Sequence, residues 1–190
     1  MARPRSNERR AAILAAATEL IATQGLGAAT AEIAKKAGVP HGSLFTYFSS
    51  KVELFNVLYL EVTKELTDTV VAGMPGGKDT RAQFRHLWVT WTRWGVANPS
   101  KRRAQRQLNV SKLVSEQNRN AAYAYADPVY QLIRRVSATG VLHNAPIRYV
   151  GALVSAWAET TMDYMIRTPA EADRPCKSGF DAVWVALSKR

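Results

Sequence analysis

The sequence predicts an all-α fold, with a three-helix unit containing a helix-turn-helix over residues 6–66 and a longer helical domain over residues 78–190. Apolar residues recur at helical spacing in nearly every segment, and no segment alternates with the period of a β-strand. A lone glycine, Gly38, separates two short helical segments near the N-terminus. The segment 71–78 holds three glycines and one proline, which predicts the end of a helix and a domain boundary.

The first helix is predicted to end at Gly25. Ile13, Ala17, Leu20 and Ile21 recur at helical spacing and form one apolar face. Gly25 follows this pattern directly, at the position where a helix commonly stops.

The next segment, residues 30–48, predicts two short helices that cross at a fixed angle. Gly38 can take the positive φ that a tight turn between them requires. Ala34 is small enough to let the second helix approach closely. The apolar contacts between the two helices are expected from Ile33, Ala34, Ala37, Val39, Leu44 and Phe48. Together these residues predict a helix-turn-helix, the motif that places a helix in the major groove of DNA.

The second of these helices has a small, polar outward face. With Leu44 directed to the core, a step of 100° per residue places Gly42, Ser43 and Thr46 on the opposite side. Phe45 and Tyr47 fall on the two flanks. Such a face can approach base edges closely, so we favour DNA contact over the alternative of a solvated surface helix.

A fourth helix follows in the sequence. Ser50-Lys51-Val52-Glu53 has the spacing of a capping box at its start. Its apolar stripe consists of Leu54, Phe55, Leu58, Val62 and Leu66.

Further helices are predicted beyond residue 78. One helix contains Phe84, Leu87, Trp88, Trp91 and Gly95 and stops near Asn98-Pro99, and a basic helix spans about 100–108. Asp127-Pro128 is either the cap and first residue of another helix or a kink. Helix 146–167 is apolar on most sides. Helix 178–189 carries a stripe of Phe180, Val183, Trp184 and Leu187.

Residues 6–66 resemble the TetR family of bacterial transcriptional regulators. The resemblance is carried by the order of the helices and by Gly25-Leu26-Gly27-Ala28-Ala29-Thr30, Tyr47-Phe48-Ser49-Ser50-Lys51 and Glu53-Leu54-Phe55. It implies a homodimer whose N-terminal unit binds double-stranded operator DNA. It also implies a C-terminal domain that binds a small-molecule effector and forms the dimer interface.

The resemblance also assigns residues to DNA contact. Thr30, Gly42, Tyr47 and Lys51 match positions that commonly contact phosphates in the family. His41, Ser43, Phe45 and Thr46 match variable positions that read or approach bases. Three residues depart from the usual pattern: Leu26 replaces a larger aromatic, Pro40 replaces a capping serine, and Phe45 replaces a tyrosine.

Composition limits the other classes of function. The net charge of +11 is concentrated beyond residue 72, so it does not locate a DNA-binding surface. The short basic segment Arg3-Pro4-Arg5 could enter a minor groove or remain a solvated tail. The three histidines lack metal-ligand spacing, no catalytic motif is present, and one cysteine, Cys176, excludes an internal disulfide. We therefore expect a cytoplasmic protein that is not an enzyme, with no cofactor, no metal site and no membrane segment.

The effector site is expected among the aromatic residues of the C-terminal domain, namely Trp88, Trp91, Tyr123 and Trp157. Core packing is an equally good explanation for each of them. Glu159 and Asp163 face away from the apolar side of their helix, so a strongly cationic ligand is disfavoured and a neutral or anionic, largely apolar one is expected. A basic cluster at 101–119 could bind an anion, approach DNA or remain solvated.

These features predict a repressor that a small molecule releases from a palindromic operator. The alternative is a dimeric regulator or architectural DNA-binding protein without a ligand. The dimer interface is expected from the stripe of helix 178–189 and from one face of helix 146–167, formed by Arg148, Ala152, Ser155, Glu159 and Asp163.

Overall fold

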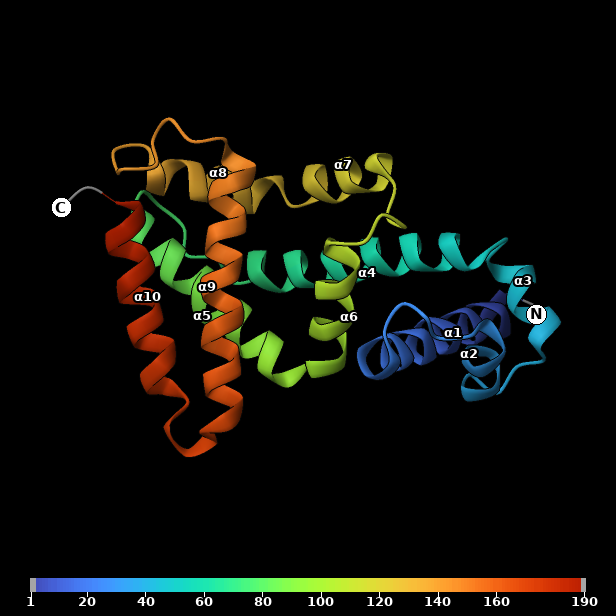
Figure 1. Cartoon of the computed structure of the whole chain (residues 1–190). Helices are drawn as coiled ribbons and strands as arrows, with labels where there is room; N and C mark the ends of the chain where they lie inside the picture. Colours follow the sequence, from blue (N-terminus) through green and yellow to red (C-terminus); the bar gives the residue numbers. More distant parts are fainter. Residues whose placement is uncertain (1–2, 189–190) are drawn as a thin grey trace. The chain divides into compact units, whose positions relative to one another are not determined.

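The structure, a computed structural model, describes residues 3–188, and for residues 3–5 it describes the backbone only. Within this range the chain is all-helical, with ten α-helices, one short 3-10 helix and no strand (Figure 1). The all-α fold class is therefore confirmed. Contacts divide the chain into two compact units. Unit 1 takes the chain up to Thr63 together with Asn98–Tyr123, and unit 2 takes Lys64–Ala97 and the chain from Ala124 onward.

Unit 1 is built around α1 (Arg3–Gln24), α2 (Thr30–Lys36), α3 (His41–Tyr47) and the first part of α4 (Lys51–Val71). The backbone of α1 begins at Arg3, and the side chains of Arg3 and Arg5 lie outside the described residues. Gly25 has a φ of +84°, so the expected glycine stop of the first helix is present. The apolar face predicted for α1 is buried at Ile13, Ala17 and Ile21.

Two later helices also belong to unit 1, although they follow α5 in the chain. They are α6 (Pro99–Asn109) and most of α7 (Glu116–Tyr125). The helices α6 and α1 pack together, and the Gln107 side-chain amide donates a hydrogen bond of 2.8 Å to the Ile21 carbonyl. This grouping differs from the boundaries at 66 and 78, which followed the order of the chain.

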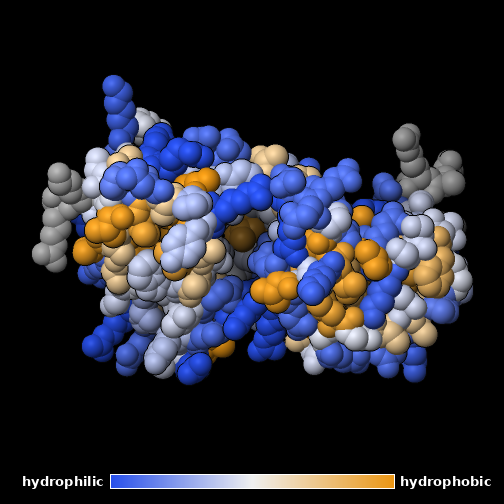
Figure 2. Space-filling view, turned by 45° about the horizontal axis from the view of Figure 1, so that its top comes forward, coloured by the Kyte–Doolittle hydropathy of each residue, from blue (hydrophilic) through white to orange (hydrophobic). Residues whose placement is uncertain are grey.

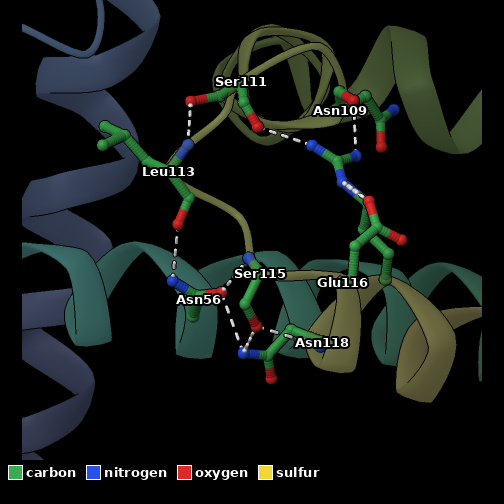
Figure 3. A network of polar contacts seen from close by, with 8 residues as sticks. Asn56, Asn109, Ser111, Leu113, Ser115, Glu116 and Asn118 are labelled. Atoms are coloured by element: carbon green, nitrogen blue, oxygen red, sulfur yellow. Dashed lines mark hydrogen bonds and ion pairs between the residues drawn. The ribbon is translucent and has the colours of Figure 1, made fainter.

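A buried asparagine fixes the loop between α6 and α7 onto α4 (Figure 3). The Asn56 amide donates to the Leu113 carbonyl at 2.9 Å. Its oxygen accepts from the Ser115 backbone N–H at 3.0 Å and from the Asn118 side chain at 2.8 Å. Because these bonds satisfy both ends of the Asn56 amide, a polar side chain can be buried here at little cost.

Unit 2 consists of the end of α4, α5 (Thr80–Ala97), α8 (Asp127–Ser137), α9 (Ile147–Arg167), the 3-10 helix η1 (Pro169–Glu171) and α10 (Asp173–Leu187). In Figure 1, α9 and α10 lie side by side, and both contact α5. Their shared core centres on Trp88, which is fully buried and donates its indole N–H to the Cys176 carbonyl at 2.9 Å. Pro128 lies in the first turn of α8, so Asp127-Pro128 starts a helix and does not kink one.

Glycines allow two of the closest helix contacts in unit 2. A Cβ atom at Gly151 would lie 2.6 Å from the Tyr130 ring. A Cβ atom at Gly179 would lie 2.6 Å from Thr161 Oγ1 and 2.8 Å from the Trp88 ring. Real Cβ atoms do not approach other atoms this closely, so α9 and α10 depend on glycine to pack as they do.

The expectation that the α10 stripe forms a dimer interface is wrong for this face. Phe180, Val183 and Leu187 are buried in the core of unit 2, and Trp184 stacks on Phe180 with ring centroids 6.2 Å apart. The helix also begins at Asp173, earlier than expected, because Pro175 is tolerated in a first turn.

Both units keep apolar side chains at the surface, as the orange areas among hydrophilic residues in Figure 2 show. The most exposed large ones are Val110, Val141, Tyr149, Tyr164 and Val185. Among residues 3–188, no helix has the length and apolar character needed to cross a membrane.

Candidate nucleic-acid interface

The turn between α2 and α3 has the geometry that a helix-turn-helix requires. Gly38 has a φ of +68°, and its N–H donates to the Lys35 carbonyl at 3.2 Å. The next N–H, from Val39, donates to the Ala34 carbonyl at 3.0 Å. Leu44 is 0% exposed and so anchors α3 to the core of unit 1. The angle of α3 is therefore set by one glycine turn and by buried apolar contacts.

The outward side of α3 is accessible. His41, Gly42, Phe45 and Thr46 are exposed, while Ser43 is half-buried. The two phosphate-contact candidates at the end of α3 and the start of α4, Tyr47 and Lys51, are also half-buried. Apart from its chain neighbours and the backbone of α3 itself, no atom lies within 4 Å of the position that a Cβ would take at Gly42. The backbone of α3 can therefore come close to another molecule at this residue.

Two candidate residues from different helices contact each other. Thr30 Oγ1 and His41 Nε2 form a hydrogen bond of 3.1 Å, which joins the first residue of α2 to the first residue of α3. The His41 ring also packs edge-on against Phe45, with centroids 5.3 Å apart and planes at 70°. The resemblance assigned Thr30 and His41 to DNA contact, and helical spacing placed Phe45 on a flank of α3, but neither indicated that the three side chains contact one another.

The start of α4 is capped by the predicted serine and glutamate, with one change. Ser50 Oγ accepts from the Glu53 N–H at 3.1 Å, as a capping box requires. The Glu53 carboxylate, however, accepts from the N–H and hydroxyl of Ser49, one residue before the expected donor. The Ser49 hydroxyl and then its N–H stabilise the ionised carboxylate and lower the pKa of Glu53 from its ordinary value.

Cations near this surface are held by neighbouring groups. The Lys51 ammonium lies 5.4 Å from the centre of the Phe55 ring. Arg10, which the sequence did not single out, bonds Glu61 at 2.6 Å and lies 5.5 Å from the centre of the Phe48 ring. Because Arg10 and Glu61 are 51 residues apart, helical spacing alone could not reveal this pair.

The four residues proposed to contact an effector differ in burial and belong to two different units. Trp88 is 0% exposed within the core of unit 2, and half-buried Trp91 packs against the same core. Trp157 is 36% exposed on the surface of α9. Tyr123 is half-buried and belongs to unit 1.

The structure instead places a cavity of about 990 Å³ between α5 and α10 of unit 2. Its apolar lining comes from Ala82, Val89, Cys176 and Phe180. Its polar lining comes from Asp79, Arg81, Arg85, His86, Thr90, Arg93, Asp173, Lys177 and Asp181. The sequence did not indicate this cavity, because its two walls are about 90 residues apart in the chain, although Arg81, Arg85 and Val89 do form an i, i+4 row.

All three acidic groups of this cavity have partners. Asp173 pairs with Arg93 at 3.3 Å, and Lys177 pairs with Asp181 at 2.9 Å. Asp79 accepts the Ala82 N–H at 2.9 Å, where it caps α5. The remaining cations are Arg81, which lies over the Phe180 and Trp184 rings, and exposed Arg85.

Part of the basic cluster at 101–119 has a structural role. Arg119 donates to the carbonyls of Asn109 and Ser111, the former at 2.7 Å (Figure 3). Arg102 is only 7% exposed. These two residues are therefore not available as a solvated anion site.

Comparison with known proteins agrees with this geometry. Residues 13–58 match the model of the bacterial regulatory proteins of the tetR family. A putative tetR family transcription regulator from Shewanella sp. is 29% identical, with 96% of this chain and 99% of that chain covered and a TM-score of 0.85. A TetR family transcription regulator from Marinobacter aquaeolei is 21% identical, covers 99% and 100% of the two chains and has a TM-score of 0.82. The fatty acid degradation regulator FadR from Bacillus halodurans shares the fold at 17% identity, with 96% and 97% covered and a TM-score of 0.72.

Proposed function

Because the chain belongs to the TetR family of bacterial regulatory proteins and is a DNA-binding transcriptional regulator, we propose that it is a repressor released from a palindromic operator by a small molecule. The observation that supports DNA binding is the way α3 is held in unit 1. Its inner side is anchored by Leu44, and its outer side is exposed at Gly42 and Thr46. A rigid helix with a small outward face suits insertion into the major groove.

In this proposal residues 6–66 form the DNA-binding domain, and the contacts divide into two classes. Thr30, Gly42, Tyr47 and Lys51 contact phosphates, which positions the protein without reading sequence. His41, Ser43, Phe45 and Thr46 approach the bases, which determines sequence preference. Four of these eight residues are exposed and the other four are half-buried, so all eight have surface that is open to contact with DNA.

Residues 78–190, the proposed effector-binding and dimerisation domain, supply the dimer interface from the exposed face of α9. Tyr149 and Tyr164 are each 55% exposed there, and Ala152 and Ala156 lie exposed between them along the helix. Exposed aromatic residues with small residues between them suit close packing of a second helix. In a two-fold dimer this face meets its own copy.

The effector is proposed to be a neutral or anionic, largely apolar molecule. The cavity between α5 and α10 supports this class, because apolar residues form part of its lining and its acidic groups already have partners. Contact with Trp88, Trp91, Tyr123 or Trp157 stays a prediction, and for Trp88 it would require opening the core.

A matched pair of ligands tests the effector class. Decanoate and decyltrimethylammonium carry alkyl chains of similar length and opposite charges, so their effects on operator binding and on tryptophan fluorescence compare the two charges. Decanoate is expected to bind and to weaken operator binding, and Arg85→Ala is expected to reduce its affinity, with Lys112→Ala in unit 1 as the control. Release by the cationic compound alone would contradict the proposed class.

The second candidate function, a ligand-independent dimeric regulator or architectural protein, differs in one measurement. Operator affinity would then stay the same with and without an extract of small molecules from the cells that produce the protein.

A further inference from the structure

The hydrogen bond between Thr30 and His41 has a consequence for base recognition. It occupies Nε2 of the imidazole, and the edge of the Phe45 ring restrains the plane of the same imidazole. Nδ1 is then the polar atom of His41 that remains for another molecule. His41 is exposed and is the first residue of α3, the end of a recognition helix that contacts base edges.

The number of protons on the two side chains determines whether His41 Nδ1 donates or accepts a hydrogen bond. A neutral imidazole carries one N–H, and a threonine hydroxyl carries one O–H. A phosphate oxygen only accepts hydrogen bonds, so a Thr30 hydroxyl that contacts phosphate must donate its proton to it. Thr30 Oγ1 must then accept from His41 Nε2–H, because both partners cannot be acceptors. Nδ1 is left without a proton and can only accept.

We propose that Thr30 is a positioning residue that makes His41 an acceptor, so that His41 reads an exocyclic amino group of adenine or cytosine in the major groove. This inference rests on the proposed phosphate contact of Thr30 and on the proposed DNA binding through α3. Adenine N6 and cytosine N4 are the amino donors that the major groove presents. Guanine N7 and O6 are acceptors, so they cannot pair with Nδ1 in this state.

The test begins with duplexes selected from a random library by the wild-type protein at pH 8, where an ordinary imidazole is neutral. Each adenine in the half-site is replaced in turn by purine and each cytosine by 2-pyrimidinone, which removes the amino group alone. One replacement is expected to weaken wild-type binding about fivefold or more, since a donor is lost opposite a desolvated acceptor. Replacing guanines by 7-deazaguanine should have no effect that depends on His41.

Variants show which residues cause the loss of affinity on removal of the amino group. His41→Ala is expected to bind the amino-free duplex and its parent equally well. Thr30→Val keeps the shape but loses the hydroxyl, so it should bind all duplexes less well and should also lose most of the penalty. Thr30→Ser should retain it. The control is Thr23→Val, because the Thr23 hydroxyl bonds the Glu19 carbonyl of its own helix, at 2.9 Å.

Three results would overturn the inference while leaving DNA binding in place: no amino-dependent position in the wild type, a full penalty in His41→Ala, or a full penalty in Thr30→Val. If Thr30→Val lowers the affinity for all duplexes without changing base preference, Thr30 contacts a phosphate but does not position His41. Failure to enrich any duplex would instead contradict the proposed function, so the two failures are distinguishable.

Discussion

Two glycines of unit 1, Gly38 and Gly42, have different physical roles. Gly38 has a φ of +68°, a conformation that side chains with a Cβ rarely adopt, and it is needed for the turn itself. Gly42 has no positive φ and no neighbour within 4 Å of a Cβ position. The fold therefore does not require glycine at residue 42, whereas close approach to a phosphate would.

Gly42→Ala is expected to fold as well as the wild type or better, because alanine favours a helix by about 1 kcal/mol over glycine. Its affinity for DNA should fall for all sequences alike, since the added methyl group holds the backbone away from the phosphate. Thermal melting and fluorescence anisotropy on several duplexes measure both effects. Gly27→Ala is the matched control, because Gly27 also has free space around it and lies outside the candidate contacts. Unchanged DNA affinity in Gly42→Ala would contradict the close approach.

At the scale of elements, the residues at the start of α3 and of α4 determine how each helix begins. Pro40 gives α3 no side-chain cap, whereas Ser49, Ser50 and Glu53 form a reciprocal set of bonds at the start of α4. The ionised form of Glu53 is the one that accepts both bonds from Ser49. This cap is therefore a pH-dependent part of unit 1.

Glu53→Gln is expected to lower the melting temperature near neutral pH and to have little effect in acid. Because the pKa of Glu53 is lowered in the folded state, its stabilisation is present above the unfolded pKa, ordinarily 4.5, and is lost as pH falls through the folded value. The measurement is the difference in melting temperature between variant and wild type from pH 7 down to pH 3. Glu8→Gln, on the exposed part of α1, is the control. A difference that does not shrink in acid would show that the carboxylate charge is not the cause.

In unit 2, Gly179 allows α10 to pack against α5 and α9. Gly179→Ala is expected to destabilise the protein by about 1–3 kcal/mol, because its Cβ would overlap Thr161 and Trp88. Chemical unfolding measures this free energy, with Gly76→Ala as a control, since Gly76 has no atom within 4 Å of a Cβ position. Equal stability of the two variants would mean that the helices separate without cost.

Most of the helical elements could be predicted from the sequence because their signals are local. The turn at Gly38, the start of α4 at Ser50 and the break after Val71 each depend on residues within a few positions of one another. What an apolar face packs against could not be predicted from local signals. The stripe on α10 was visible, but spacing could not tell whether Phe180 faces its own core or a second chain, and the structure gives its own core. The site contacts missed, such as Thr30–His41 and Arg10–Glu61, join separate helices.

At the scale of the whole molecule, the proposed dimer depends on α9 alone for its central contact. Ala156→Glu places a charge in the middle of the exposed face of that helix, so it is expected to convert the dimer to a monomer without unfolding unit 2. Sedimentation at micromolar concentration measures the state, and Ala170→Glu in η1 is the control on an exposed residue outside this face. A variant that remains dimeric would remove α9 from the interface.

The most direct test of the central claim is a footprint of the wild-type protein on the duplex that it selects from a random library. Two copies of α3 related by a two-fold axis should protect two inverted half-sites, with centres separated by about 34–36 Å or a small multiple of this distance. That result would support a dimeric regulator that reads DNA through α3. Protection of one asymmetric half-site by a stable monomer, or enrichment of no duplex at all, would contradict it.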